Sequence, residues 1–197
     1  MSEIKRALAY EMHSPARKSF PRRKFKVLGI GDLLQGDLVE MQTYAKENKG
    51  YRYMLTLIDC FSKKAWAVPI KDKTGLNVTK AVASVLPTGV KNLQTDAGKE
   101  FLNKEFKALM DKRNINHYHT FTNMKAAIVE RFNKTLKNWM WREFSVNGNY
   151  KWLDMLPKLL SKYNNKVHRS IGMKSNDVNS KNSPLVYERL MVSTSDD

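Results

Sequence analysis

The sequence predicts an α/β fold with a mixed five-stranded sheet, from its strand-like segments, its helix-like segments and their order. Five short segments rich in apolar and β-branched residues lie between polar or turn-forming stretches, as expected of strands: residues 35–42, 53–60, 65–70, 90–95 and 115–120. Two segments with apolar residues at helical spacing separate the last three, at about 74–86 and 103–112. The order βββαβαβ, followed by further helices, is typical of a sheet with crossover helices.

The first three strands are expected to form an antiparallel meander, because the polar segment KENKG between the first two suits a hairpin turn. Three more helices are predicted after the fifth strand. They begin near Met124, span about Trp152 to Lys166, and fall within SPLVYERL near the C-terminus. Pro157 lies inside the second of these and predicts a kink, because proline removes a helical hydrogen bond.

The helix that begins near Met124 is predicted to have two distinct faces. At about 100° per residue, its large apolar side chains lie on one face: Ile128, Val129, Phe132, Leu136, Trp139 and Met140. Glu130, Lys134, Lys137 and Trp141 form a narrow stripe on the opposite side, which we expect to face outward. Arg131 points elsewhere on the helix, which favours a structural role.

The charge of the chain favours a polyanionic partner. It has 197 residues, 42% of them hydrophobic, with a net charge of +16 and a pI near 9.9. Nucleic acid is the first candidate. A membrane surface is a weaker one, since the basic residues are spread along the chain and no apolar run approaches the ~20 residues that span a bilayer. The single cysteine, Cys60, excludes an intramolecular disulfide and a zinc site built from several cysteines. We expect it to be a buried strand residue.

Composition divides the chain into three parts: a basic arm at 1–30, a core at 31–175 and a polar C-terminal tail at 176–197. The arm contains PARKSFPRRKFK, whose two prolines prevent a regular helix. Its cluster Arg22, Arg23 and Lys24 suits phosphate contact or a nuclear-import signal, and a solvated tail without a partner is an equal alternative.

Three acidic residues lie within or beside apolar segments: Asp37 in QGDLVEM, Asp96 in VKNLQTDAG and Glu130 in AAIVERFNK. Carboxylates are ligands that Mg²⁺ prefers. Two such ions about 3.5–4 Å apart can activate a nucleophile and stabilise the leaving oxygen at a phosphodiester. Asp37 and Asp96 become neighbours if their strands pair in parallel, because ligands gather beyond the carboxyl ends of parallel strands.

The pattern alone leaves other interpretations open. Asp37 is consistent with a surface residue of an edge strand, Asp96 with a turn residue, and Glu130 with an exposed ion pair to Lys134. Asp59, in LIDCFSK, fits a metal site almost as well. Spacing does not choose among these acids.

Four segments occur in order: GDLVEM, YRYMLTLIDCFSKKAWAVPIKDKTG, LQTDAGKEF and KAAIVERFNKTLKNWMW. Together they resemble the catalytic core of retroviral-type integrases, and most closely the integrases of Maverick/Polinton DNA transposons. The resemblance runs from about Pro15 to about Met173. It implies an RNase H-like fold in which Asp37, Asp96 and Glu130 are the D, D and E of a metal-binding triad, and it leaves Asp59 a structural or turn role.

The resemblance also implies the chemistry. Mg²⁺ or Mn²⁺, as two ions, would be held by Asp37 at both sites and by Asp96 and Glu130 at one site each. The implied activity is 3′-end processing of element DNA by water, then strand transfer of the new 3′-OH into target DNA. The partners implied are element-end DNA, target DNA and further copies of the chain. The expected setting is the nucleus, after a cytoplasmic stage before import.

Basic residues of related integrases that contact the DNA end match Lys134 and Lys137. Asn133 on the same helix and Arg22, Arg23 and Lys24 in the arm complete the set of residues that we expect to bind DNA. Trp141, one turn beyond Lys137, suits either base stacking or simple covering of the helix surface. The second interpretation is favoured.

Two departures from the family pattern stand out. Only 33 residues separate Asp96 from Glu130, slightly fewer than in integrases of this type, and the shortfall lies in HTFTNMK, where the family has a mobile loop. No counterpart of the zinc-binding N-terminal domain or of a C-terminal DNA-binding module is visible, which fits a core fragment or a reduced protein. An RNase H-like nuclease and a degenerate or domesticated DNA-binding protein without turnover remain as alternatives.

Overall fold

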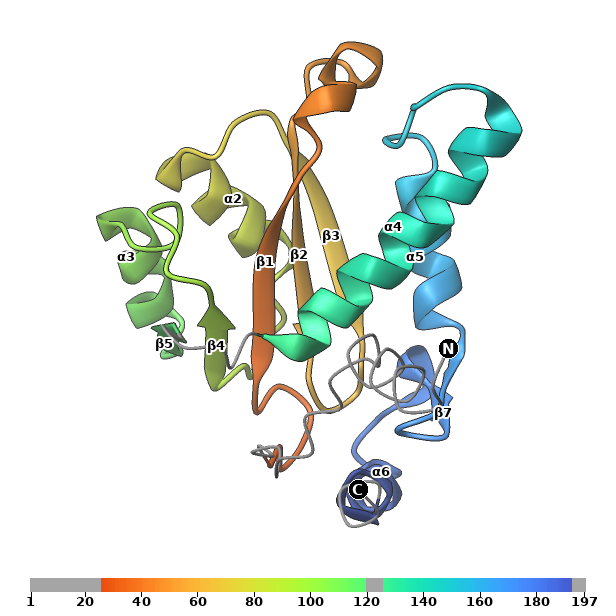
Figure 1. Cartoon of the computed structure of the whole chain (residues 1–197). Helices are drawn as coiled ribbons and strands as arrows, with labels where there is room; N and C mark the ends of the chain where they lie inside the picture. Colours follow the sequence, from red (N-terminus) through yellow and green to blue (C-terminus); the bar gives the residue numbers. More distant parts are fainter. Residues whose placement is uncertain (1–25, 120–125, 193–197) are drawn as a thin grey trace, which may run out of the picture.

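The computed structural model describes residues 26–119 and 126–192, and its centre is a five-stranded sheet with helices on both faces (Figure 1). The strands of this sheet are β1 (Leu34–Glu40), β2 (Tyr53–Asp59), β3 (Ala65–Ile70), β4 (Asn92–Thr95) and β5 (Asn116–His119). The helices are η1 (Gln42–Asn48), α2 (Gly75–Val85), α3 (Lys104–Lys112), α4 (Ala127–Asn147), α5 (Leu156–Asn164), η2 (Ser175–Asp177) and α6 (Ser183–Val192), of which η1 and η2 are 3-10 helices. A small hairpin joins β6 (Val167–His168) to β7 (Met173–Lys174).

The strand order is β3-β2-β1-β4-β5. β1, β2 and β3 pair as an antiparallel meander, whereas β1 pairs with β4, and β4 with β5, in parallel. The predicted mixed sheet, its five strands and the meander are therefore confirmed. The parallel pairing of β1 with β4 is the condition on which the proximity of Asp37 and Asp96 depends.

β2 shows why the sheet is covered on both faces, since all seven of its residues are buried. Leu55 and Leu57 belong to the hydrophobic cluster beneath α2 and α3, and Met54 and Ile58 belong to the cluster beneath α4 and α5. Alternate side chains of a strand point to opposite faces, so one strand contributes to both cores. In Figure 1, α2 and α3 lie on one side of the sheet and α4 and α5 on the other.

α4 lies across β1 and β2 with the orientation that its sequence predicts. Val129, Phe132, Leu136 and Met140 are buried in the cluster beneath it. The stripe Glu130, Lys134, Lys137 and Trp141 is exposed. The two faces of the predicted helix are thus confirmed.

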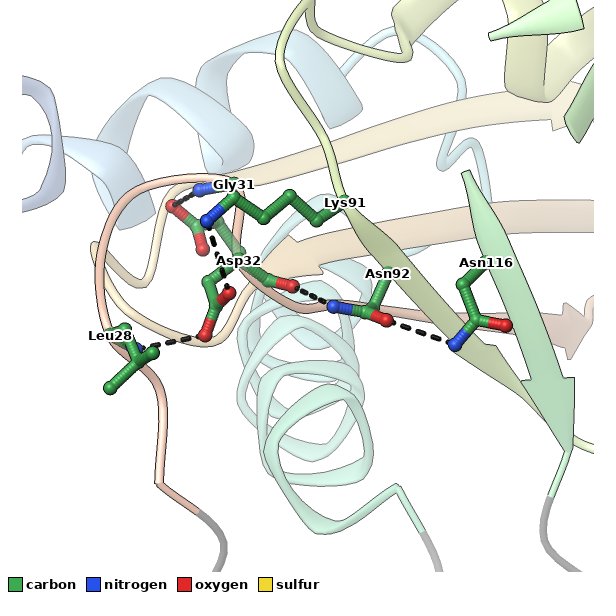
Figure 2. Close-up of polar contacts among 7 residues, drawn as sticks. Leu28, Gly31, Asp32, Lys91, Asn92 and Asn116 are labelled. Atoms are coloured by element: carbon green, nitrogen blue, oxygen red, sulfur yellow. Dashed lines mark hydrogen bonds and ion pairs between the residues drawn. The ribbon is translucent and has the colours of Figure 1, made fainter. Parts of the chain in front are cut away.

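A chain of polar contacts ties together the N-terminal ends of β1, β4 and β5 (Figure 2). Asn92 Nδ2 donates to the Asp32 carbonyl at 2.8 Å, and Asn116 Nδ2 donates to Asn92 Oδ1 at 3.0 Å. The Asp32 carboxylate accepts from the Leu28 N–H at 2.9 Å and pairs with Lys91 at 3.8 Å. These contacts fix the register of the three strands at one end, and with it the position of Asp96 beyond β4 relative to Asp37 in β1.

The kink predicted at Pro157 is wrong. α5 begins at Leu156, which places Pro157 in the first turn. N–H groups of the first turn have no partner within the helix, so the missing N–H of proline costs no hydrogen bond there. The preceding residues take another path because Trp152 N and Leu153 N both donate to Asn48 Oδ1, at 2.8 and 3.2 Å.

The segment predicted as a tail, 176–197, also differs from expectation where the structure describes it. It contains α6, as the sequence predicts for SPLVYERL, and α6 packs on the core. Val186 is fully buried and Leu190 nearly so, in a hydrophobic cluster with Phe61, Ile171 and Val27. A boundary at residue 175 therefore does not separate the core from α6. Val27, placed in the predicted arm, is buried in the same cluster.

Candidate functional site

Asp37 lies at the centre of β1 and is half-buried. Its Oδ1 accepts from the Leu38 N–H at 2.8 Å, and its Oδ2 accepts from Asn133 Nδ2 at 2.7 Å. Burial raises the pKa of Asp37, and the negative charge of Asp96 raises it further, against the lowering effect of the two hydrogen bonds. A partly dehydrated carboxylate beside a second acid favours a bound cation, because the cation offsets both penalties.

Gly36 leaves room beside β1 for a side chain of the neighbouring strand β2. A Cβ on Gly36 would lie 2.9 Å from Leu57 Cδ2 and 3.5 Å from Thr95 Cγ2. A larger residue would displace Leu57 or the strand itself. Gly36 therefore allows the Leu57 side chain of β2 to pack closely against β1, the strand that carries Asp37.

Asp96 follows β4 directly and is exposed. Gln35 and Gln94 are partners in the parallel pairing of β1 with β4, and Asp37 and Asp96 each come two residues later. Asp96 Oδ1 accepts from the Gly98 N–H at 3.2 Å, which closes a turn after the strand. The structure thus places the two acids at equivalent positions along neighbouring chain segments, Asp37 within β1 and Asp96 directly after β4.

Gln35 is a positioning residue that no sequence pattern singles out. Its side chain is 1% exposed, and its Nε2 donates to Gln94 Oε1 at 2.9 Å. Its Oε1 accepts from the N–H groups of Ile128 and Val129, at 3.0 and 3.1 Å. These are donors of the first turn of α4, which has no side-chain cap of its own. Gln35 therefore fixes the start of α4, and with it Glu130, against β1.

Glu130 is exposed in the first turn of α4 and shares an open groove with Asp37. The groove has a volume of about 510 Å³, and its lining mixes acids, amides and lysines: Asp37, Leu38, Val39, Glu40, Glu130, Asn133, Lys134, Lys137, Asn138 and Trp141. We call it the α4 groove. It has the charge pattern that a phosphate chain held beside metal ions requires.

Lys134 and Lys137 are exposed on the same face as Glu130, as the helical wheel predicts, and both line the α4 groove. Lys137 lies near enough to Asp37 that its charge counters, in part, the rise in pKa that burial causes there. Arg131 lies instead near Lys63 and Tyr163, on another side of the helix.

Asn133 is predicted from the sequence to contact DNA, and the structure places it beneath the groove surface. It is 6% exposed, and its Nδ2 donates to Asp37. Its Oδ1 is buried without a hydrogen-bond partner among the described residues. The amide cannot be reversed, because that would set its oxygen against the carboxylate. In this position Asn133 orients Asp37 and leaves one unused oxygen beside it.

The three acids share one region but do not form a ready-made metal cluster. Within 26–119 and 126–192, no three His, Cys, Asp or Glu side chains stand close enough to hold an ion together. Carboxylates repel one another when no cation lies between them. The donor set nevertheless fits a hard cation: Asp37 is held in place, Asn133 Oδ1 is unused, and the exposed side chains of Asp96 and Glu130 can turn inward.

Asp59, the rival acid, has a different setting. It is 2% exposed and accepts hydrogen bonds from Ser62 Oγ at 2.7 Å and Phe61 N at 3.1 Å, with longer bonds from Ser62 N and Gly31 N. These bonds hold the turn that follows β2, which agrees with the structural role that the resemblance assigns to it.

Three further expectations concern the single cysteine, the basic arm and a membrane span. Cys60 is buried, as predicted, but it lies in the turn directly after β2 and not in a strand. Arg22, Arg23 and Lys24 lie outside the described residues. Within the described part of the chain, no helix has both the length and the apolar character needed to cross a bilayer.

A larger groove of about 1060 Å³ lies between α3 and β5, and it contains Lys104, Lys107 and His117 but neither Asp37 nor Glu130. The chemistry of its lining, rather than its volume, decides against it as the site of the acids. The α4 groove is therefore the candidate site.

Residues 30–123 match the integrase core domain family. This part of the chain is similar to integrase core domains. A transposon-derived protein of Caenorhabditis elegans is 35% identical over 141 residues, which cover 70% of this chain and 49% of that protein. The Gag-Pol polyprotein of woolly monkey sarcoma virus is 31% identical over 121 residues, or 59% of this chain and 7% of the polyprotein. The chain thus spans about half of the first relative and a small part of the second.

Solved structures show the same fold for this chain. A chain of the simian T-cell lymphotropic virus intasome superposes with a TM-score of 0.66 at 21% identity, covering 88% of this chain and 66% of that one. The HTLV-2 integrase catalytic core domain, solved in complex with magnesium, gives 0.62 at 21% identity over 78% of this chain and 99% of that one. The mixed five-stranded sheet is that of integrase catalytic cores, so the predicted RNase H-like fold is confirmed.

Proposed function

We propose that this chain is a DNA integrase that carries out divalent-metal-dependent 3′-end processing and strand transfer of element DNA ends into target DNA. The observation that carries the proposal is the α4 groove. Its lining includes Asp37, Glu130, Lys134 and Lys137. The charge of Asp96, which follows the neighbouring strand β4, acts on Asp37 as well. The match to the integrase core domain family supports the same chemistry.

In this proposal Asp37, Asp96 and Glu130 hold Mg²⁺ or Mn²⁺, as two ions. When bound, the ions neutralise charge on the phosphodiester and lower the pKa of a hydroxyl or water that attacks it. The protein positions the acids and binds the DNA. Asn133 fixes the Asp37 carboxylate, Gln35 fixes the start of α4, and the exposed lysines bind DNA phosphates.

The proposed partners are the two DNA ends of an element, target DNA and further copies of the chain. A net charge of +16 supports a polyanionic ligand. Joining two ends at one target needs more than one active site, which supports a homo-oligomer. Arg22, Arg23 and Lys24 are proposed as additional phosphate contacts and as part of a nuclear-import signal, which would place the protein in the nucleus.

We further propose a Maverick/Polinton type of transposon as the source. The supporting observations are the four integrase-like segments of the sequence and the similarity to a transposon-derived protein of Caenorhabditis elegans.

Strand joining tests the proposed function. The chain is incubated with Mg²⁺ or Mn²⁺, a fluorescent pool of duplexes with randomised ends and a supercoiled plasmid. We expect shortened duplexes and labelled plasmid, and we expect neither with Asp37→Asn, Asp96→Asn or Glu130→Gln. Glu143→Gln is the matched control, because Glu143 lies near the other end of α4 and outside the groove lining.

Other outcomes identify the alternatives. Shortened duplexes, or cleavage of an RNA–DNA hybrid, without any joined product would indicate an RNase H-like nuclease. DNA binding that weakens with salt but leads to no product with either metal would indicate a domesticated DNA-binding protein. Joining that survives in all three acid variants would remove the triad assignment.

A further inference from the structure

Trp141 continues the functional stripe of α4 beyond its lysines. On the same helix face, it comes one turn after Lys137, two turns after Lys134 and three turns after Glu130. Its side chain is 47% exposed, and it lines the α4 groove together with Asp37 and Glu130. At about 1.5 Å per residue, it lies roughly 16 Å along the helix from Glu130. An exposed indole at the end of a cationic groove is an unusual use of a large apolar side chain.

Other aromatic side chains pack against the indole of Trp141. The ring of Trp141 is nearly perpendicular to those of Tyr44 and Phe144, with centroids 5.8 and 5.6 Å away. Tyr44 is itself stacked on Tyr150 at 5.0 Å. A ring fixed in this way loses little conformational entropy when a ligand packs against it.

Trp139 shows what a purely structural tryptophan of α4 looks like. It is packed against Tyr163 at 6.3 Å, with Lys162 Nζ 4.8 Å from its ring centroid. It does not line the α4 groove. Only one of two tryptophans two residues apart is therefore placed to meet a ligand there.

We propose that Trp141 stacks on an unpaired nucleobase at the end of the DNA whose phosphates lie along Lys134 and Lys137. The inference deepens the proposed function and rests on it. A base has a π-face that any aromatic side chain can cover. Inside a duplex both faces are covered by neighbouring pairs, so a frayed or single-stranded end is the part of the DNA that can offer one. The distance from Glu130 corresponds to about five steps of 3.4 Å along a strand.

The test compares two duplexes of equal length. One carries a single-stranded end of about five nucleotides, with 2-aminopurine at each position in turn, and the other is closed by hairpins at both ends. Trp141→Ala should weaken binding of the open-ended duplex roughly 5- to 150-fold, abolish quenching of 2-aminopurine at one position and leave hairpin binding unchanged. Trp141→Phe should retain most of the affinity. Trp139→Phe is the matched control and should bind both duplexes normally.

Salt dependence separates stacking from charge. Lys134→Ala should make the dependence of log affinity on log salt less steep by about one unit, whereas Trp141→Ala should leave the slope unchanged. Thermal unfolding of each variant identifies a folding defect. If the alanine variant unfolds, Trp141→Leu, which keeps an apolar side chain without an aromatic ring, replaces it and should show the same selective loss.

If Trp141→Ala binds open-ended DNA as the wild type does, or weakens both duplexes equally, the stacking proposal is overturned while the integrase proposal stands. If the wild type binds neither duplex, both proposals are overturned.

Discussion

Asp37 and Asp59 show how similar sequence surroundings produce different roles. Both lie in or directly at the end of an apolar strand, and burial raises the pKa of both. Asp59 accepts from four protein donors and closes a turn. Within the described part of the chain, Asp37 accepts from two donors, lies near the charge of Asp96 and lines a groove that contains lysines. An acid whose oxygens are saturated by protein donors is part of the scaffold, and one whose oxygens keep free lone pairs near a like charge is available for a ligand.

The largest expected difference is in folding stability. Asp59→Ala removes four hydrogen bonds and leaves buried donors without acceptors, so we expect a loss of about 3 kcal/mol in the free energy of unfolding. Asp37→Asn relieves repulsion with Asp96 and should unfold at the same or a higher urea concentration than the wild type in metal-free buffer. Equal losses in the two variants would contradict the distinction.

Asn133 sharpens the comparison. It donates to Asp37 from α4, which is far away in the sequence, whereas the side chain that donates to Asp59 belongs to Ser62 in the adjoining turn. Asn133→Ala should lower the rate of strand joining roughly 10- to 100-fold, as loss of a residue that orients a ligand typically does. DNA affinity should hardly change. The control is Asn138→Ala, an exposed asparagine of the same groove. A large loss of DNA affinity with normal turnover would instead restore Asn133 to direct DNA contact, as the sequence predicts.

A metal titration tests directly whether Asp37 holds an ion. Mg²⁺ at about ten times its dissociation constant should stabilise the folded chain by about 1.4 kcal/mol, measured as a rise in Tm. The rise should be lost in Asp37→Asn and kept in Asp59→Asn. A rise of the same size in both variants would place the ion away from the α4 groove.

The parts of this molecule that depend on local periodicity could be predicted from the sequence. The five strands and the two faces of α4 follow from the spacing of apolar residues, and the structure has both. The packing of Val186 on the core joins segments that are distant in the chain. Composition alone indicates a tail there, because it carries no information about such a contact.

Within the candidate site, the sequence indicates the acids and the lysines but not the residues that hold them. Gln35 and Asn133 act through hydrogen bonds to residues that are distant in the chain, Ile128 and Asp37 respectively. No local pattern encodes such a contact. The kink predicted at Pro157 is wrong for a related reason. The N–H groups of Trp152 and Leu153 donate to Asn48, which is distant in the chain, so the segment before Pro157 does not join the helix.

The smallest expected effect is the pH dependence that burial of Asp59 creates. Burial raises the pKa of this carboxyl above its ordinary value of 3.8, against the hydrogen bonds that lower it. As pH rises through 3.8, the unfolded chain therefore releases its proton before the folded chain does, and this group's contribution to stability falls until the folded carboxyl also ionises. Relative to Asp59→Asn, the wild type should lose stability over that interval, as measured by urea unfolding at a series of pH values. A wild type that gains on the variant over the same interval would show that the four donors outweigh burial, and Asp59 would then differ from Asp37 in the direction of its pKa shift as well as in its partners.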